Sequence, residues 1–296
     1  MTWRCTVLRA GRFRLDGGGM FGVVPKAIWS RMTEVAEDNT IPLECNCLLL
    51  ERDGRRVLVE TGNGEKWSEK ERAIYHLQRR TVLDALAERD LDPGDIHDVV
   101  LTHLHFDHAG GLTRWAPDGV TPIPAFPNAR IHVQEREWRD ADANRAVMTR
   151  TYLRSHLDPV AEAVELADGE AEILEGIRVL PVPGHTWGQQ AVLVDTEAGT
   201  VCFPGDVMPT VHHAGDAFNM GYDIEPYTNM GTKRDLLRRA AAEDWTIILD
   251  HEPGDPAVRV REDAERPGRM VLEPSTGAVT VAEDAVDAID AIDAAD

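Results

Sequence analysis

Three histidines and one aspartate lie within the six positions 103–108 of the segment Thr-His-Leu-His-Phe-Asp-His, residues 102–108. The segment follows the apolar run Val99–Leu101, which predicts a short buried strand. Imidazole nitrogen and carboxylate oxygen are the ligands that zinc and related divalent cations take in proteins. Without a metal, four such groups after a buried strand would be a costly cluster of polar side chains. The sequence therefore predicts a metal-binding turn at this point.

The spacing within this turn indicates ligands for two metal ions. His103 and His105 lie two positions apart, so in extended backbone both side chains project to the same side. Asp107 and His108 follow after the chain turns, where they can face a second metal close to the first. We therefore expect this turn to supply about half of a two-metal site.

Polar residues also follow other predicted strands. In the first half, a hairpin is predicted over Leu43–Leu50 and Arg55–Val59, followed by a helix and the strand before the histidine turn. The second half repeats this order of hairpin, helix and strand, which predicts two sheets with helices outside. The polar residues that follow the strands are Glu60, His185, Asp206 and His251.

These residues together resemble the metallo-β-lactamase superfamily. Its HxHxDH signature matches His103 to His108. The resemblance extends over residues 40–255 through Glu60-Thr61-Gly62, Gly184-His185, Gly205-Asp206 and His251. It implies an α/β fold, the metallo-β-lactamase-type αββα sandwich, in which helices flank two mixed sheets. Aspartate is commoner in the family at the position of Glu60, which we expect to orient a metal ligand from behind.

The resemblance also implies a dinuclear site, filled by zinc or alternatively by iron, manganese or cobalt. A water bridging the two metals would be the source of the attacking hydroxide. Asp107 would both bind metal and assist proton transfer to the leaving group. The implied ligands are His103, His105 and His185 for one metal, Asp107, His108 and His251 for the other, and Asp206 as the bridge.

The residues around this site bear on the substrate. The chain resembles the branch that holds N-acyl-homoserine lactonases and organophosphate hydrolases, but Pro209 replaces the tyrosine that those lactonases carry three residues after the bridging aspartate. Tyr222 or His213 could approach the same space, and His213 is therefore a candidate catalytic residue. The expected pocket residues are Met20, Phe21, Phe106, Phe218, Met220 and Tyr222.

The leading functional prediction is a metallohydrolase that acts on a small-molecule ester, lactone or thioester. The same metal chemistry would also serve a phosphotriesterase, which is the alternative within the family. A metal-stabilised ligand-binding or sensor protein on the same fold is the alternative from another class. Either a monomer or a homodimer is compatible with the sequence.

The composition argues against nucleic-acid and membrane partners. The formal net charge of −21 disfavours binding to a phosphate backbone, which requires clustered lysine and arginine. Lysine is rare and arginine supplies most of the positive charge, which either a high-salt habitat or a GC-rich genome would explain. No apolar run is long enough for a membrane span and the N-terminus lacks the apolar core of a signal peptide, so we expect no membrane partner and a cytoplasmic location.

Three further expectations concern chain organisation. Residues 1–281 are predicted to form one domain and residues 282–296 an acidic tail peripheral to function. The glycine-rich segment 16–22 is predicted to be a mobile loop that either covers the core or lines the pocket. Residues 270–281 are predicted to form a last hairpin.

Overall fold

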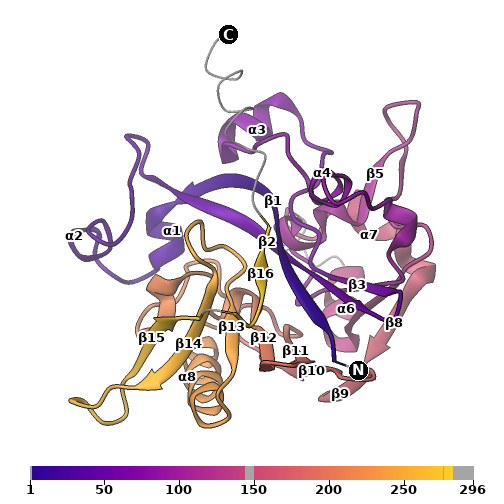
Figure 1. Ribbon diagram of the computed structural model, residues 1–296. Helices are drawn as coiled ribbons and strands as arrows, with labels where there is room; N and C mark the ends of the chain where they lie inside the picture. The colour runs from indigo at the N-terminus through magenta and orange to yellow at the C-terminus, as the bar shows by residue number, and fades with distance from the viewer. Residues whose placement is uncertain (1, 144–149, 276, 283–296) are drawn as a thin grey trace.

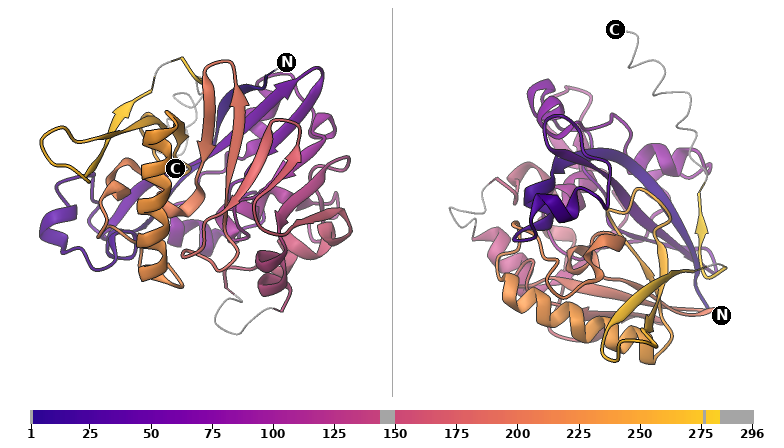
Figure 2. Two further views of the ribbon diagram at one scale, coloured as in Figure 1. Left: turned by 90° about the horizontal axis from the view of Figure 1, so that it is seen from below. Right: turned by 90° about the vertical axis from the view of Figure 1, so that its left-hand side faces the viewer.

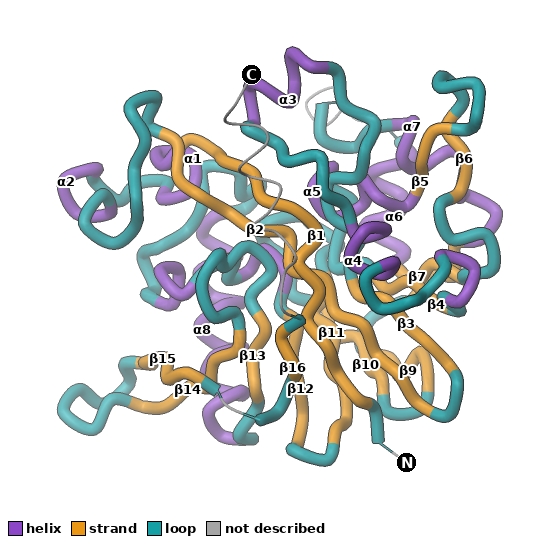
Figure 3. Tube along the Cα trace, turned by 45° about the horizontal axis from the view of Figure 1, so that its top comes forward, coloured by secondary structure: helices purple, strands orange, loops and turns teal. Residues whose placement is uncertain are grey.

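The computed structural model describes residues 2–143, 150–275 and 277–282. Its strands form two seven-stranded sheets and one two-stranded sheet, with helices on the outer sides (Figures 1 and 3). Both large sheets contain parallel and antiparallel pairs. The predicted α/β sandwich of two mixed sheets is confirmed.

The first large sheet is built mostly from the first half of the chain, and the second large sheet from the second half. The first has the order β16 (Thr280–Val281), β1 (Arg4–Asp16), β2 (Thr40–Arg52), β3 (Arg55–Val59), β4 (Asp98–Val100), β7 (Arg130–Gln134), β8 (Val164–Ala167). The second has the order β15 (Met270–Pro274), β14 (Ala257–Glu262), β13 (Thr246–Ile248), β12 (Gly199–Phe203), β11 (Gln190–Thr196), β10 (Ile177–Pro181), β9 (Ala171–Leu174). The small sheet pairs β5 (Thr113–Trp115) with β6 (Pro122–Pro124).

Alternation along the strands sorts side chains into three apolar layers. Val7 and Leu48 face the core between the sheets, which also holds Phe203 of β12. Their neighbours Leu8 and Leu49 face the opposite way, into the core under the helices, because successive strand residues point to opposite faces. The prediction of a single domain is not tested by these contacts, but a core shared by both sheets gives it a physical basis.

Helices cover the outer faces of both sheets. The helix α8 lies along the outer side of the second sheet (Figure 2), where Leu236 and Leu237 are buried. No helix among the described residues combines the length and the apolar composition needed to cross a bilayer. The α-helices are α1 (Gly17–Phe21), α2 (Lys26–Trp29), α3 (Glu69–Tyr75), α4 (Val82–Ala87), α5 (Phe106–Ala109), α6 (Glu135–Asp142), α7 (Arg154–Leu157) and α8 (Pro226–Ala242).

Residues 17–21 of the glycine-rich segment 16–22 form the helix α1, so the prediction of a loop there was wrong. Oδ1 of Asp16 accepts a hydrogen bond from the N–H of Gly19 at 2.8 Å and caps α1. Gly17 packs so closely on Trp29 that a Cβ at this position would lie 2.3 Å from the indole ring. The glycines therefore allow close packing of a short helix, which composition alone does not distinguish from flexibility.

Residues 270–281 do not form the predicted hairpin. β15 pairs antiparallel with β14, whereas β16 pairs in parallel with β1 of the other sheet (Figure 1). Val279 and Val281 pack against the core between the sheets, and this contact stabilises β16 in its position beside β1 of the first sheet. Most of the predicted acidic tail, residues 283–296, lies outside the described residues.

The parallel pairs bring the polar strand ends together. β4 runs parallel to β3 in the first sheet, and β12 runs parallel to β13 in the second. The carboxyl ends of parallel strands meet at one edge of a sheet, where open α/β sheets bind their ligands. The polar segments that follow these four strands therefore gather at a common edge of the sandwich.

Candidate metal centre

The first group of polar side chains at this edge, the histidine cluster, consists of His103, His105, His185 and Asp206. One nitrogen or oxygen donor from each of the four lies within 4.8 Å of the others, and all four residues are buried. Nδ1 of His105 is 2.9 Å from Nε2 of His185, which in turn is 3.0 Å from Oδ2 of Asp206. Residues from the two halves of the chain thus converge on one point.

The second group, the carboxylate cluster, consists of His108, Asp206, Asp250 and His251, again with donors within 4.8 Å of one another. Nε2 of His251 lies 3.2 Å from Nε2 of His108 and 3.2 Å from Oδ1 of Asp206. Asp206 belongs to both clusters, so its two oxygens can serve both. Asp107 lies beside this cluster, with its carboxylate oxygens 3.8 Å from Nε2 of His108 and 3.7 Å from Nε2 of His251.

Hydrogen bonds on the outer side hold the rings of the histidine cluster. Oγ1 of Thr102 lies 3.0 Å from Nδ1 of His103. Oδ1 of Asp223 accepts from Nδ1 of His185 at 2.9 Å, which leaves the lone pair on Nε2 directed into the cluster. Such contacts fix both the orientation and the tautomer of a metal-binding imidazole.

The carboxylate cluster is held in the same way. The main-chain carbonyl of Glu44 accepts from Nδ1 of His251 at 2.9 Å. Oε2 of Glu60 lies 3.2 Å from Nδ1 of His108, and its Oε1 accepts from the N–H of Thr102 at 2.7 Å. Glu60 adopts a left-handed backbone conformation with φ +66°, which turns the longer side chain under the histidine turn. Glu60 therefore lies where the sequence predicted an orienting residue.

Both clusters have the chemistry of a metal site. Nε2 of His103 and Oδ2 of Asp250 are buried and form no hydrogen bond with any described residue. Burial, reinforced by the neighbouring imidazoles, lowers the pKa of His103 well below its usual value, so that its ring is neutral. Neutral imidazole is the form that binds divalent cations. Nearby carboxylates outweigh burial and raise the pKa of His185 to about 10 and of His251 to about 9, so a metal binding there would displace a proton. The residues therefore fit a pair of such ions.

A buried carboxylate that the sequence did not point to, Glu137 of α6, supports the histidine cluster. It accepts hydrogen bonds from the N–H of Leu104 at 3.0 Å and from Oγ1 of Thr186 at 2.7 Å. It also accepts from the hydroxyl of Tyr152 at 2.9 Å. Glu137 thereby joins the segments that carry His103, His105 and His185, and no spacing in the sequence signals this contact.

Asp223 and Asp250 were also missed by the sequence reasoning. Asp250 directly precedes His251, and Asp223 directly follows Tyr222, so both adjoin residues that were already candidates. A search for acidic residues next to each candidate would have found them. Their contacts with His185 and with the carboxylate cluster, however, depend on how the loops fold.

A pocket of about 290 Å³ opens directly onto the metal centre. Four predicted pocket residues, Met20, Phe106, Met220 and Tyr222, line it, together with Leu15, Tyr75, Thr151 and Ile224. The wall also includes metal-centre residues, namely His105, Asp107, His185, Asp206 and His251. The lining formed by the described residues is therefore largely apolar, and it contains no lysine or arginine.

Phe21 and His213, by contrast, do not line this pocket. Nδ1 of His213 lies 2.8 Å from Oγ1 of Thr210, and its Nε2 donates to the carbonyl of Met20 at 2.8 Å. The ring stacks on buried Phe21 at 5.1 Å, and burial lowers the pKa of His213 to about 4. A catalytic role for His213 stays a prediction, while its contacts show it holding the backbone of a pocket residue.

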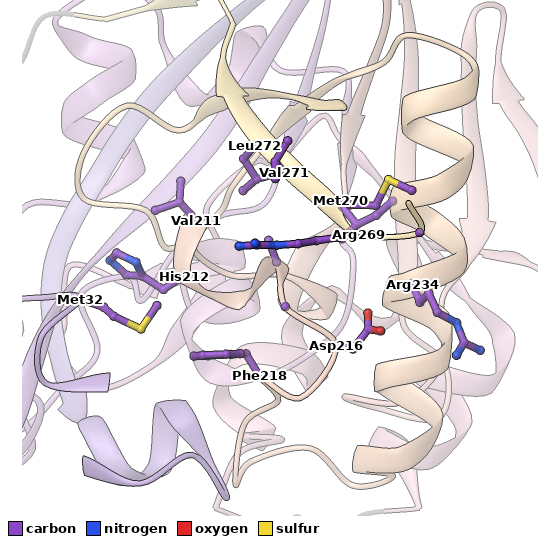
Figure 4. A pocket seen from close by; sticks show the side chains of 14 residues that line it. Met32, Val211, His212, Asp216, Phe218, Arg234, Arg269, Met270, Val271 and Leu272 are labelled. Carbon is purple, nitrogen blue, oxygen red and sulfur yellow. The ribbon is translucent and has the colours of Figure 1, made fainter. Parts of the chain in front are cut away.

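Phe218 points into a different cavity, of about 660 Å³, between the 211–218 loop, β15 and α8 (Figure 4). None of the metal-centre residues lines this cavity. Arg269 extends across it above Phe218 (Figure 4). Phe218 also contacts Phe21 edge-on at 6.3 Å, so it reaches the substrate pocket only through a second layer of packing.

One family model and several known proteins are similar to this chain. The model of the metallo-beta-lactamase superfamily matches residues 40–251. A probable metallo-hydrolase of Mycobacterium tuberculosis is 33% identical over 249 residues, which cover 72% of this chain and 76% of that protein. An N-acyl homoserine lactonase of Bacillus thuringiensis is 29% identical over 193 residues, or 60% of this chain and 70% of the lactonase.

The similarity extends to solved structures. The crystal structure of a probable metal-dependent hydrolase from Staphylococcus aureus superposes with a TM-score of 0.83 at 27% sequence identity. The superposition covers 93% of this chain and 99% of that one.

Proposed function

The chain belongs to the metallo-beta-lactamase superfamily and is a metal-dependent hydrolase, and we propose that its substrates are uncharged small-molecule esters, lactones or thioesters. The observation that carries this proposal is the pocket over the metal centre, whose lining by described residues is largely apolar and lacks lysine and arginine. Apolar walls favour an alkyl or aryl acyl group. The described lining therefore offers no cationic partner to a substrate with a free carboxylate or phosphate.

The proposed metal ligands are the seven residues that the family resemblance implies. They are His103, His105, Asp107, His108, His185, Asp206 and His251. The imidazole nitrogens favour zinc at the histidine cluster. When bound, the two cations supply Lewis acidity, which lowers the pKa of a water molecule and polarises the substrate's carbonyl oxygen. Contacts with Thr102, Asp223, Glu60 and the Glu44 carbonyl hold four of the proposed ligands in orientation, namely His103, His185, His108 and His251.

In this proposal, the hydroxyl of Tyr222 donates a hydrogen bond to the substrate. It lines the pocket beside Asp206 and His185, although it lies sixteen positions after Asp206 in the chain. Burial raises the pKa of Tyr222 to about 12, so its hydroxyl stays protonated at neutral pH. A protonated phenol can donate to the carbonyl oxygen and to the negative charge that develops there. Tyr222 thus substitutes for the tyrosine that Pro209 replaces.

Asp107 has a second proposed role besides binding metal. It lies in the pocket lining, whereas the neighbouring ligand His108 does not. A carboxylate that faces both the metal centre and the substrate can take up a proton at one oxygen and donate it to the leaving alcohol or thiol. This transfer completes hydrolysis without a separate general acid.

Turnover of four matched substrate classes tests the proposal. Zinc-loaded protein is assayed with an N-acyl homoserine lactone, an aryl ester, a thioester and an aryl phosphotriester, and the chelator-treated protein serves as the control. We expect kcat/KM to be highest for one of the three carbonyl substrates. A higher value for the phosphotriester would favour the phosphotriesterase alternative. No turnover by fully loaded protein would favour a ligand-binding role.

A further inference from the structure

The two clusters of the metal centre differ in their donors. Apart from the shared Asp206, the histidine cluster offers only imidazole nitrogens, from His103, His105 and His185. The carboxylate cluster offers two imidazoles and the carboxylate of Asp250, with Asp107 lying beside it. Nitrogen-rich sites suit zinc, whereas carboxylate-rich sites suit harder cations such as Mn²⁺.

Asp250 is the residue that makes this difference, and the family signature does not include it. It is 1% exposed, and a carboxylate oxygen lies within 4.8 Å of the donor atoms of His108, Asp206 and His251. Its Oδ1 accepts from the N–H of His251 at 3.1 Å, while Oδ2 is buried without a hydrogen bond. A buried carboxylate oxygen without a partner is costly, and a proton or a bound cation removes that cost.

Neighbouring strands hold Asp250 in this position. Its carbonyl accepts from the N–H of Asn46 on β2 at 2.8 Å, and the side-chain amide of Asn46 donates to the carbonyl of Leu249 at 2.8 Å. The backbone is therefore fixed on both sides of the carboxylate. The carboxylates of Asp107 and Asp206 face imidazole nitrogens of His108, His185 and His251, with Oδ2 of Asp206 3.7 Å from His108 and 3.0 Å from His185, so donors to a shared cation surround this point.

We propose that Asp250 is an additional ligand of the metal in the carboxylate cluster. The extra oxygen donor makes this position more tolerant of Mn²⁺, relative to Zn²⁺, than the position in the histidine cluster. The inference rests on the proposed two-metal centre, but it concerns which ions bind and not which substrate is cleaved. The protein would then bind two different metals when both are supplied.

Locating two different ions in one crystal tests this assignment. Full-length protein is loaded with Mn²⁺, and one equivalent of Zn²⁺ per chain is added before crystallisation. Anomalous differences at the zinc and manganese absorption edges then place each ion. We expect zinc beside His185, and manganese beside His251 with an Asp250 oxygen in its coordination sphere. An equal distribution of zinc, or an Asp250 that binds no metal, would overturn the proposal.

Substitution provides an independent readout in solution. Asp250→Asn removes the charge with little change in shape, and we expect its affinity for the second Mn²⁺ to fall about tenfold or more. Asp250→Glu retains the carboxylate and should lose less, which separates loss of a ligand from general damage. An unchanged Mn²⁺ affinity in Asp250→Asn would contradict the proposal.

The matched control is Glu252→Gln, which alters an acid one position beyond His251. Its Oε2 accepts from the N–H of Val211 at 3.0 Å and its Oε1 from the N–H of Gly254 at 2.9 Å. We expect this variant to keep the wild-type metal content. Because metal location is read without turnover, inactive protein with the expected ions would count against the proposed substrates and not against Asp250.

Discussion

The metal centre and the pocket wall next to it are held in place by different means. Around the metal centre, Asp223 and Glu60 fix ring nitrogens of His185 and His108 from behind. In the pocket wall, the side chains of Met20 and Met220 are held by apolar packing, and directional contacts reach only their backbones, from His213 and Asp223. Tyr222 is 43% exposed, and its hydroxyl forms no hydrogen bond with another described residue.

We infer from this difference that the metal centre performs the reaction and that the pocket wall selects the substrate. Residues fixed by several directional contacts are preorganised, and a change behind them alters metal binding. Residues held by apolar packing alone can be exchanged for others of similar volume at modest cost. We therefore expect substitutions in the pocket wall to change substrate preference while metal content stays constant, and substitutions around the metal centre to do the reverse.

Removal of the Asp206 carboxylate, which both clusters share, should have the largest effect on metal content and on turnover. Asp206→Ala takes one donor from each cluster, so we expect metal content to fall and kcat/KM to drop by about a thousandfold or more. Metal analysis and turnover on the same sample check both. His105→Ala should likewise lower metal content. A fully loaded and active Asp206 variant would refute the assignment of the centre.

The scaffold beneath the histidine cluster should show the next largest effect. Glu137→Ala leaves Leu104, Thr186 and Tyr152 without the acceptor they share, so we expect the free energy of unfolding to fall by about 3 kcal/mol. Denaturant unfolding of the metal-free protein measures the change. Glu135→Ala on the same helix removes only a bond to Arg139 and should cost under about 1 kcal/mol. Equal losses in both variants would argue against the proposed support.

Loss of one outer hydrogen bond should weaken metal binding without abolishing it. Asp223→Asn removes the charge behind His185, and we expect metal affinity to fall about ten- to a hundredfold. Competition with a chromophoric chelator measures this affinity. Asp216→Asn changes an exposed acid of the same loop and should bind metal as the wild type does. Indistinguishable affinities in the two variants would contradict the role of Asp223.

The pocket hydroxyl should affect catalysis and leave metal binding unchanged. Tyr222→Phe removes one donor to the developing negative charge, and we expect kcat to fall about tenfold. Gly19→Ala offers a second route to the same result, because a Cβ there would lie 2.2 Å from the Tyr222 hydroxyl and displace it. If neither variant changes kcat, the hydroxyl has no part in the reaction.

The sequence predicted the architecture because local patterns determine it. The apolar run before His103 and the hairpin after Leu43 each correspond to strands in the structure. Four of the seven proposed ligands were predictable because the His-x-His-x-Asp-His spacing is a local feature. His185, Asp206 and His251 were proposed from the family resemblance, and the structure brings all seven side chains together. Their assignment to particular metals stays a prediction.

Contacts between distant segments could not be predicted in this way. Glu137 lies more than thirty positions beyond His103 on a helix, and only the folded chain brings it under Leu104. The substrate pocket was predicted in part for the same reason: Phe21 and Phe218 are apolar and close in sequence to pocket residues, yet they pack one layer away. Sequence proximity does not reveal which side of a loop faces a cavity.

The central claim, that the metal centre performs the reaction and the pocket wall selects the substrate, is tested most directly by a ratio. The measurement is kcat/KM for an octanoyl ester divided by kcat/KM for the acetyl ester of the same alcohol, in Met220→Ala and in Glu60→Gln, a change behind His108 and outside the pocket lining. We predict a several-fold change of the ratio in Met220→Ala with unchanged metal content. In Glu60→Gln we predict lower absolute rates at an unchanged ratio. A shifted ratio in Glu60→Gln, or an unshifted one in Met220→Ala, would contradict the claim.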